Sequence, residues 1–329
     1  MLEFKQYQKT LKEYNYIDLF AGIGGFRLGL DYFGANCVFT SEWNKYASEV
    51  YFNNFGEMPE GDITKIKEDH IPKHDIICAG FPCQPFSISG SRGGFDDTRG
   101  TLFFDIARIA NYHKPKILLL ENVRNILSLD SGKVTKKIVK TLNDIGYNVF
   151  IELLKGNDFG VPQQRERVFF ICIREELNVS DFSLSKPNIG PEFVKDILEK
   201  SRQKHLEINR NDISINKTNK ADLFGSETNR PLRIGTINKG GQGERIYSTD
   251  GVGVTLSAFG GGPGRKTGAY LIKNKIRRLT PRECARMMGF PDSFILHTSD
   301  TQSFIQFGNA VIVNKVQFII KDLIDKNVL

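Results

Sequence analysis

The chain has 329 residues, a formal net charge of +7, 40% hydrophobic residues and 25% charged residues. These proportions are typical of globular proteins and exclude wholesale disorder and fibrous classes. No run approaches the ~18 apolar residues of a membrane span, and the polar start is unlike a secretory signal, so we expect a cytoplasmic protein without a membrane partner.

Short apolar runs alternate with helical patterns along the first half of the chain. This pattern predicts strands at 16–20, 37–40, 75–79, 116–120 and 168–173, and helices at 25–33, 45–55, 102–112 and 133–145. Alternation at this spacing predicts an α/β fold with a doubly wound, mostly parallel sheet covered on both faces. Further on, Thr280 and Glu283 flank a proline in the pattern of a helix start, and a last apolar helix is expected at about 309–323.

The net positive charge is concentrated in one glycine-rich stretch. Residues 229–279 contain ten Lys or Arg and only two acidic residues, whereas the rest of the chain is close to neutral. A polar Asn/Lys-rich segment precedes this stretch, so we predict a larger domain of 1–195 plus 275–329 and a smaller inserted domain of 196–274 that contains β-structure. The basic insert suits a polyanionic partner such as nucleic acid, although a solvated surface segment would have a similar composition.

The cysteines and histidines lack the spacing of a metal site. The five cysteines include no C-x-x-C pair, and the five histidines are scattered. We therefore expect neither a disulfide framework nor a structural metal, and stoichiometric zinc in the purified protein would contradict this expectation.

A glycine-rich turn at 18–26 follows the first predicted strand and leads into a helix. Glu42 lies twenty residues beyond Gly22, at the end of the second predicted strand, where a carboxylate can accept from two ribose hydroxyls. Trp43 could stack on an adenine, and Asp62 could meet the amino group of the base. The turn is not G-x-G-x-x-G and has no basic cluster beside it, which favours a nucleoside cofactor over the dinucleotide of a nicotinamide dehydrogenase. The alternative is a plain strand–helix turn with Trp43 in the core.

Three further sets of candidate functional residues lie next to predicted strands. Two of them follow a strand and one precedes a strand. Cys83 lies in the stiff loop 79–87, Glu121 ends a very apolar strand, and Arg165 and Arg167 alternate so that both point to one side if extended. These residue types suit a nucleophile, a proton-holding acid and an anion clamp. Taken singly, they also suit an inert cysteine, a turn acid and a surface salt-bridge pair.

Taken together and in this order, these segments resemble the DNA cytosine-5 methyltransferase family over nearly the whole chain. The segments that carry the resemblance are 18–25, 81–84, 121–123, 163–167, 282–291 and 307–309. The resemblance implies a Rossmann-like methyltransferase that moves a methyl group from S-adenosylmethionine to carbon 5 of a flipped-out cytosine and releases S-adenosylhomocysteine. It implies a covalent adduct between Cys83 and carbon 6, with Glu121, Arg165 and Arg167 as the other catalytic residues.

The resemblance also assigns the two domains and their contacts. The larger domain would bind cofactor and catalyse the reaction, and the insert would recognise the target. The implied cofactor-binding residues are Phe20, Gly22, Ile23, Gly24, Gly25, Glu42, Trp43, Asp62, Ile63, Gly80, Pro82, Leu102, Asn309 and Val311. The implied DNA-binding residues are Ser87, Ser89, Arg99, Arg230, Arg233, Lys239, Gln242, Arg245, Gly262 and Lys266.

The implied partner is double-stranded DNA. The amino-acid sequence of residues 239–245 is similar to that of a bacterial family member that modifies GCGC, so GCGC is the leading candidate for the target site. We expect a monomer in the bacterial cytoplasm, associated with the nucleoid through DNA and paired with a cognate restriction endonuclease. Two alternatives stay open: an RNA cytosine-5 methyltransferase of the same family, which would have less need of a long basic insert, and a non-catalytic DNA-binding regulator, which would have no reason to keep Cys83 and Glu121.

Overall fold

The computed structural model describes residues 2, 4–82, 102–190, 192–201, 204–216 and 228–329. The chain divides into two compact units, which are described separately here. The six-stranded unit comprises Glu3–Leu154, Glu166–Lys186 and Val316–Leu329, and the five-stranded unit comprises Met1–Leu2, Lys155–Arg165 and Pro187–Lys315. The predicted inserted domain, 196–274, falls within the five-stranded unit, and its exact boundaries stay a prediction.

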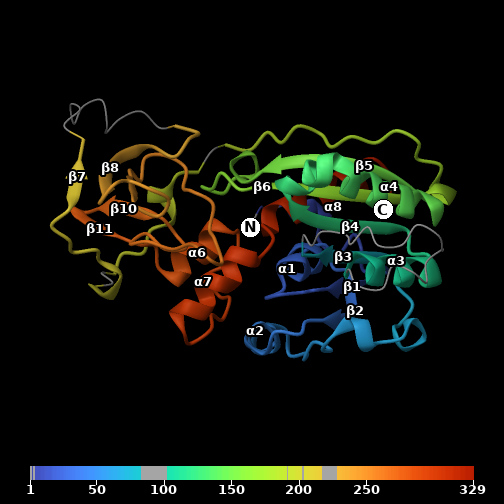
Figure 1. Cartoon of the computed structure of the whole chain (residues 1–329). Coiled ribbons are helices and arrows are strands. Elements are labelled where there is room, and N and C mark those ends of the chain that lie inside the picture. Colours follow the sequence, from blue (N-terminus) through green and yellow to red (C-terminus); the bar gives the residue numbers. More distant parts are fainter. Residues whose placement is uncertain (1, 3, 83–101, 191, 202–203, 217–227) are drawn as a thin grey trace. The chain divides into compact units, whose positions relative to one another are not determined.

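The six-stranded sheet has the order β2-β1-β3-β4-β6-β5 (Figure 1). Its strands β1 to β4 pair in parallel, whereas β6 is antiparallel to β4. The expected doubly wound and mostly parallel sheet is therefore confirmed. The strand bounds are β1 Asn15–Leu19, β2 Asn36–Ser41, β3 Ile76–Gly80, β4 Ile117–Val123, β5 Tyr147–Lys155 and β6 Glu166–Arg174.

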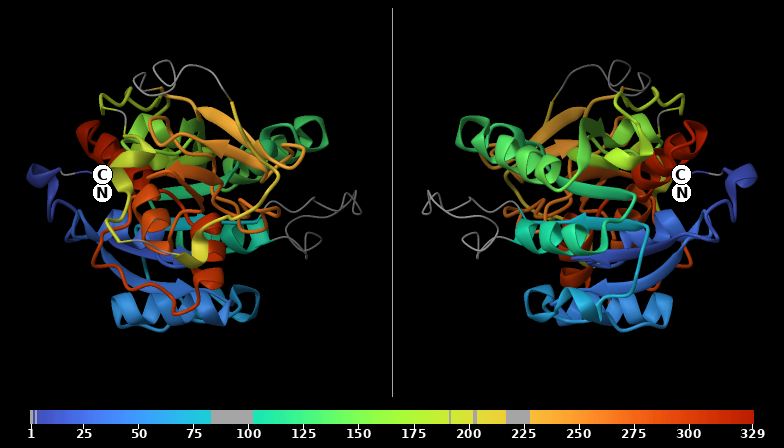
Figure 2. Two further views of the ribbon diagram at one scale, coloured as in Figure 1. Left: turned by 90° about the vertical axis from the view of Figure 1, so that its left-hand side faces the viewer. Right: turned by 90° about the vertical axis from the view of Figure 1, so that its right-hand side faces the viewer.

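Helices cover this sheet because successive residues of each buried strand face opposite sides. Ile17 and Leu19 of β1 join the apolar core formed with α3 and α4. Tyr16 faces the other side, where its hydroxyl donates to Asp31 at the end of α1. The helices flank the strands in both side views (Figure 2). Their bounds are α1 Gly25–Asp31, α2 Lys45–Phe55, α3 Leu102–His113, α4 Lys133–Asp144 and α8 Val313–Asp325.

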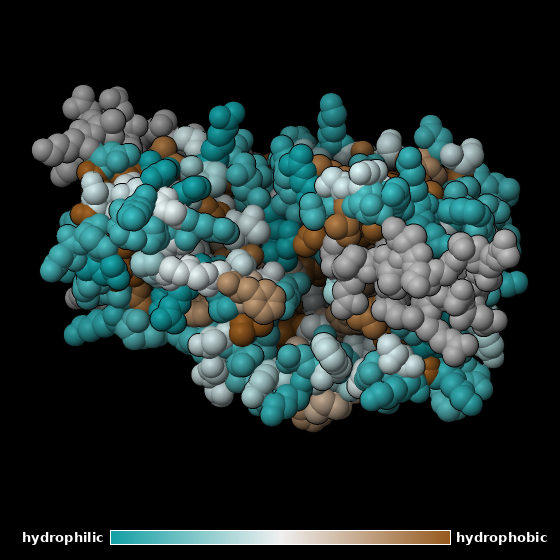
Figure 3. All heavy atoms as spheres, viewed as in Figure 1, coloured by the Kyte–Doolittle hydropathy of each residue, from teal (hydrophilic) through white to brown (hydrophobic). Residues whose placement is uncertain are grey.

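The five-stranded sheet has the order β11-β10-β9-β8-β7 around a small apolar core. Its strands are β7 Ile213–Ile215, β8 Arg233–Ile237, β9 Arg245–Tyr247, β10 Ala269–Ile272 and β11 Lys275–Arg277. Hydrophilic side chains cover most of the visible face of this sheet (Figure 3). The predicted helix start is confirmed, since α6 (Pro281–Met287) begins with a reciprocal hydrogen-bonded pair between Thr280 and Glu283.

A long apolar stretch lies near the C-terminal end of the sequence. Asp300–Asp325 is long and apolar enough to cross a membrane by length and composition, and 89% of its most apolar window is buried in the structure. The stretch comprises two helices, α7 (Asp300–Asn309) and α8, with 310–312 between them. Buried core helices share this composition, so the stretch is weak evidence for a membrane span.

Candidate active site and nucleic-acid interface

The Glu42 carboxylate, just after β2, is hydrogen-bonded to the glycine-rich turn that follows β1. Glu42 accepts hydrogen bonds from the backbone N–H of Gly22 (2.8 Å) and of Asn44 (2.7 Å), one on each oxygen. Burial raises the pKa of Glu42. Each carboxylate oxygen has a second acceptor site, so the pair of oxygens can still accept from two hydroxyl groups.

The shape of the turn leaves room beside it. Gly24 has φ +82°, and a Cβ there would lie 2.3 Å from the Phe55 ring, so only glycine fits. A Cβ on Gly22 would meet nothing within 4 Å, which marks open space next to Glu42. Phe20 adopts φ +56°, a strained conformation for a bulky residue and one that is concentrated at functional sites. The open space beside Gly22 and Glu42, which we call the cradle, is of the kind that a bound nucleoside needs.

Trp43 and Asp62, two other expected cofactor residues of this unit, are accessible, whereas Ile23 in the turn is buried. Trp43 is 83% exposed, so the alternative that placed it in the core is wrong. Asp62 accepts from the Thr64 hydroxyl (2.8 Å) and N–H (3.1 Å), and these hydrogen bonds lower the pKa of Asp62. Both side chains remain available to a ligand, whereas Ile63 is buried.

Other expected cofactor residues occur at element ends. Gly80 ends β3, Pro82 is exposed and Leu102 begins α3. Asn309 ends α7 and is exposed, while Val311 is buried; both belong to the five-stranded unit. Four residues expected in catalysis or DNA binding lie outside the described residues: Cys83, Ser87, Ser89 and Arg99.

Glu121 forms an ion pair with Arg167 across neighbouring strands. The Glu121 Oε1 atom lies 3.0 Å from the Arg167 Nε atom, and the side chains are only 11% and 15% exposed. Glu121 is the register partner of Gly80 at the end of β3. The next residue, Asn122, donates from its side chain to the Phe81 carbonyl at 2.9 Å. Strand β4 therefore holds an acid and fixes the backbone where the segment leading to Cys83 begins.

Arg165 has different partners from Arg167. It is 1% exposed, and its guanidinium donates to the backbone carbonyls of Leu256 (3.2 Å), Gly308 (2.9 Å) and Ala310 (3.0 Å). A buried guanidinium engaged by three carbonyls is suited to holding backbone segments in place. The two arginines thus have different partners, and the expectation that both are catalytic residues stays a prediction.

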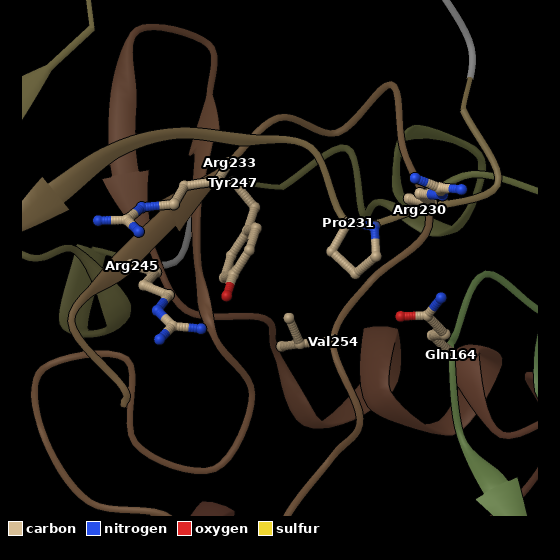
Figure 4. A pocket seen from close by; sticks show the side chains of 7 residues that line it. All are labelled: Gln164, Arg230, Pro231, Arg233, Arg245, Tyr247 and Val254. Carbon is tan, nitrogen blue, oxygen red and sulfur yellow. The ribbon is translucent and has the colours of Figure 1, made fainter. Parts of the chain in front are cut away.

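A cationic cavity of about 440 Å³ lies in the five-stranded unit. Arg233 and Arg245 approach it from β8 and β9, while Arg230 and Gln164 lie across from them (Figure 4). All three arginines were expected from the sequence to bind DNA. The other residues that line the cavity were not expected: Gln164, which is remote in sequence, and Pro231, Tyr247 and Val254, which lie close to the arginines along the chain.

The glycine loops beside this cavity are joined to each other. The N–H of Gly264 donates to the Gly243 carbonyl at 2.8 Å, and a Cβ on Gly243 would lie 2.2 Å from the Gly261 oxygen. This contact holds the loop that carries the exposed Gln242 against the loop that includes Gly262. Both are therefore parts of one surface.

An exposed aromatic residue marks the base of the second loop. Phe259 is 86% exposed, and the Lys266 ammonium lies 5.8 Å from its ring centre. Lys266 also donates to the Ala258 carbonyl. Sequence reasoning missed Phe259, although an aromatic residue followed by three glycines was a usable signal. Lys239 is exposed in the turn that follows β8.

No group of three or more His, Cys, Asp or Glu side chains within the described ranges could hold a metal ion. Four of the five cysteines are described, and all four are free thiols. Burial raises the pKa of Cys37 to about 11 and that of Cys78 well above its usual value, so both thiols are unreactive near neutral pH.

The chain was compared with known proteins. The family model "C-5 cytosine-specific DNA methylase" matches residues 14–325. The type II methyltransferase M.HhaI of Haemophilus parahaemolyticus is 52% identical over 320 residues, which cover 97% of this chain and 96% of that protein. The type II methyltransferase M.HpaII of Haemophilus parainfluenzae is 39% identical and covers 96% of this chain and 90% of its own length.

Solved structures share the fold. The Dnmt2 methyltransferase of S. pombe superimposes with a TM-score of 0.70 at 20% sequence identity and covers 95% of this chain and 99% of its own. The Entamoeba histolytica methyltransferase EhMeth gives a TM-score of 0.68 at 18% identity, with 95% and 98% covered. At these identities the structural likeness indicates the fold alone.

Proposed function

Because this chain belongs to the C-5 cytosine-specific DNA methylases, enzymes that use S-adenosylmethionine to methylate DNA, we propose that it methylates carbon 5 of cytosine within GCGC in double-stranded DNA. The reaction would pass through a covalent adduct between Cys83 and carbon 6. One observation carries the mechanism: Glu121 is paired with Arg167 and lies level with Gly80, at the start of the segment that leads to Cys83.

The chemistry follows from the weak nucleophilicity of carbon 5. Attack of the Cys83 thiolate forms the sulfur–carbon 6 bond and pushes electrons through the ring, so carbon 5 becomes enamine-like. Glu121 would hold a proton at ring N3 and contact the amino group, while Arg167 orients the carboxyl and contacts the base oxygen. S-adenosylmethionine would supply the electrophilic methyl group and leave as S-adenosylhomocysteine. The carbon 5 proton would then pass to solvent water as the sulfur–carbon 6 bond breaks and releases the Cys83 thiolate, and ring N3 would return its proton to Glu121, which restores the aromatic ring.

The cofactor fits the cradle beside Gly22. Glu42 would accept from the ribose hydroxyls, Trp43 would stack on the adenine, and Asp62 would accept from its amino group. The open space at Gly22 and the exposed ring of Trp43 support this placement. Phe20 and Leu102 would line the same site, and the resemblance to the family also proposes Asn309 and Val311 as cofactor contacts.

Replacing Glu42 by glutamine is expected to raise the KM for S-adenosylmethionine roughly tenfold or more, because charge-assisted hydrogen bonds contribute about 1.5–3 kcal/mol. Burial raises the pKa of Glu42, so the parent carboxylate becomes protonated at a higher pH than an ordinary glutamate. Its affinity for S-adenosylhomocysteine should therefore fall as the pH drops through that raised pKa, and the glutamine variant should lack this dependence. Titration calorimetry at several pH values measures both effects.

The matched control is Glu49→Gln on the exposed face of α2. It should leave the affinity and its pH dependence unchanged. If Glu42→Gln behaves like this control, Glu42 does not hold the ribose.

The target atoms are stacked inside the duplex, so the cytosine would be flipped out, as methyltransferases do in general. The joined loops with Gln242 and Gly262 would approach the duplex, and Gln242 would fill the vacated space together with Ser89. Arg245 suits guanine O6 and N7, because its guanidinium is planar and bidentate. The phosphate contacts would come from Arg230, Arg233, Lys239, Lys266, Arg99 and Ser87.

Replacing Arg245 by alanine is expected to remove discrimination at one guanine, worth about 1–3 kcal/mol. Methylation rates on duplexes that differ at single base pairs measure this loss. The control, Lys239→Ala, should weaken binding to all DNA sequences alike. It should also reduce the slope of binding affinity against salt concentration by about one phosphate contact. If Arg245→Ala weakens binding to every DNA sequence equally, Arg245 contacts a phosphate instead of a base.

We also propose that the enzyme works as a monomer in the bacterial cytoplasm, close to the nucleoid, as the modification partner of a restriction endonuclease. Labelled S-adenosylmethionine incubated with genomic DNA and, separately, with total RNA tests the activity and the nucleic acid class. Bisulfite sequencing of the product then identifies the target. Label in RNA alone would favour the RNA-methylating alternative, and no label in either would favour the non-catalytic one.

A further inference from the structure

The buried guanidinium of Arg165 joins two segments that the chain separates by about fifty residues. Leu256 lies in the segment that leads to Phe259 and Lys266, whereas Gly308 and Ala310 flank Asn309. All these residues belong to the five-stranded unit. A single side chain therefore bridges the segment that faces DNA in the proposed function and the segment that contains the proposed cofactor residue Asn309.

The residues next to Arg165 strengthen this bridge. The Gln163 side chain accepts from the Leu256 N–H (2.9 Å) and donates to the Met287 carbonyl (3.2 Å). The Thr255 hydroxyl donates to the Gln164 carbonyl at 3.0 Å. Residues 163–165 are thus bonded to 255–256 at several points, and Gln164 also lines the cavity with the three arginines.

The two bridged segments are also in direct contact. A Cβ on Gly308 would lie 2.3 Å from the Ala258 nitrogen and 2.6 Å from the Ser257 carbonyl carbon. The backbone at 257–258 is therefore packed against the last turn of α7 with no space for a side chain. A movement of one segment must displace the other or break the hydrogen bonds to Arg165.

We infer that Arg165 is a positioning residue that couples cofactor binding to DNA binding, an inference that rests on the proposed function. A cofactor that contacts Asn309 would favour one position of Gly308 and Ala310, and through Arg165 it would favour the matching position of Leu256 and of the segment beyond it that faces DNA in the proposed function. The coupling is reciprocal, because a change in DNA affinity caused by the cofactor requires an equal change in cofactor affinity caused by DNA. Lysine cannot replace this function, since a single ammonium lacks the rigid fork that reaches three carbonyls.

The test compares DNA affinity with and without S-adenosylhomocysteine. The probe is a labelled duplex that contains the proposed GCGC site, and the readout is the ratio of the two Kd values. The parent is expected to bind DNA at least about fivefold tighter with S-adenosylhomocysteine, the lower end of typical coupling. Arg165→Lys is expected to bring the ratio close to one while each ligand still binds.

A matched control separates coupling from stability. Arg277→Lys weakens another buried guanidinium of the same unit, which pairs with Glu283 at 2.7 Å and bonds to neither bridged segment. It should lower the Tm and preserve the ratio. Thr255→Val, at an exposed position that keeps the fold intact, removes one bond of the bridge and should reduce the ratio in part.

Each outcome decides the inference. A normal ratio in Arg165→Lys together with a lowered Tm would reduce Arg165 to a structural role. If Arg165→Lys does not fold, an unchanged ratio in Thr255→Val overturns the coupling. A parent that binds both ligands with a ratio of one overturns the coupling alone, whereas a parent that binds neither overturns the proposed function as well.

Discussion

Replacing Cys83 by serine is expected to abolish methyl transfer, a loss of about 10⁴-fold or more, on the scale of removing an enzyme nucleophile. A serine hydroxyl is barely ionised at neutral pH, whereas a thiol supplies a thiolate that can add to carbon 6. The measurement is transfer of labelled methyl groups to duplex DNA. DNA binding should persist, since the substitution removes no charge and little volume.

A second readout tests the adduct itself. Fluorine at carbon 5 of the target cytosine cannot leave as a cation, so elimination should stall and the parent should remain covalently attached to fluorinated duplex. Cys83→Ser should form no such complex. Cys78→Ala, which removes a thiol buried on β3, is the control and should retain both activity and the complex. Methyl transfer by Cys83→Ser at the parental rate would remove Cys83 from the mechanism.

Replacing Glu121 by glutamine is expected to lower kcat by about 10²–10⁴-fold, the usual contribution of a positioned acid or base. An amide cannot carry the proton that ring N3 needs as the thiolate adds. The substitution also leaves the Arg167 guanidinium without its 3.0 Å partner, so the Tm should fall as well. Single-turnover rates with saturating DNA and cofactor isolate the chemical step.

The control for Glu121 lies on the neighbouring strand. Glu166 pairs with Arg124 at 2.6 Å on a more exposed part of β6, and Glu166→Gln should change kcat little. Such ion pairs contribute about 0–1 kcal/mol. If Glu121→Gln matches this control in rate, Glu121 supports the fold and takes no part in proton transfer.

Much of the six-stranded unit could be predicted from the sequence, because its buried strands are short apolar runs with sharp ends. Strand β5 was missed although it contains apolar residues, and most of its residues are half-exposed or exposed, unlike those of the buried strands. Helix α7 was missed for a related reason: apart from two phenylalanines and one isoleucine, its residues are polar or glycine. Local patterns fail where burial is set by packing from distant segments.

The candidate site shows the same limit. The strand-end positions of Glu42 and Glu121 followed from the α/β alternation, because parallel strands end at one edge of a sheet. The partners of Arg165 did not, since they lie about 90 and 145 residues away. Two arginines that alternate along one segment therefore differ in their partners through tertiary contacts. Gln164 and Tyr247 escaped notice for the same reason, as the cavity that they share forms only in the folded unit.

The exposed position of Trp43 has a practical consequence. The chain contains a single tryptophan, and its ring is 83% exposed beside the cradle at Gly22. Fluorescence excited at wavelengths that only tryptophan absorbs therefore comes from Trp43 alone. Without a ligand, this indole is exposed to water. An adenine stacked on the ring would quench that emission or shift it to shorter wavelength. If adenine stacks on Trp43 as proposed, the native enzyme carries its own optical reporter of cofactor occupancy, without any attached dye.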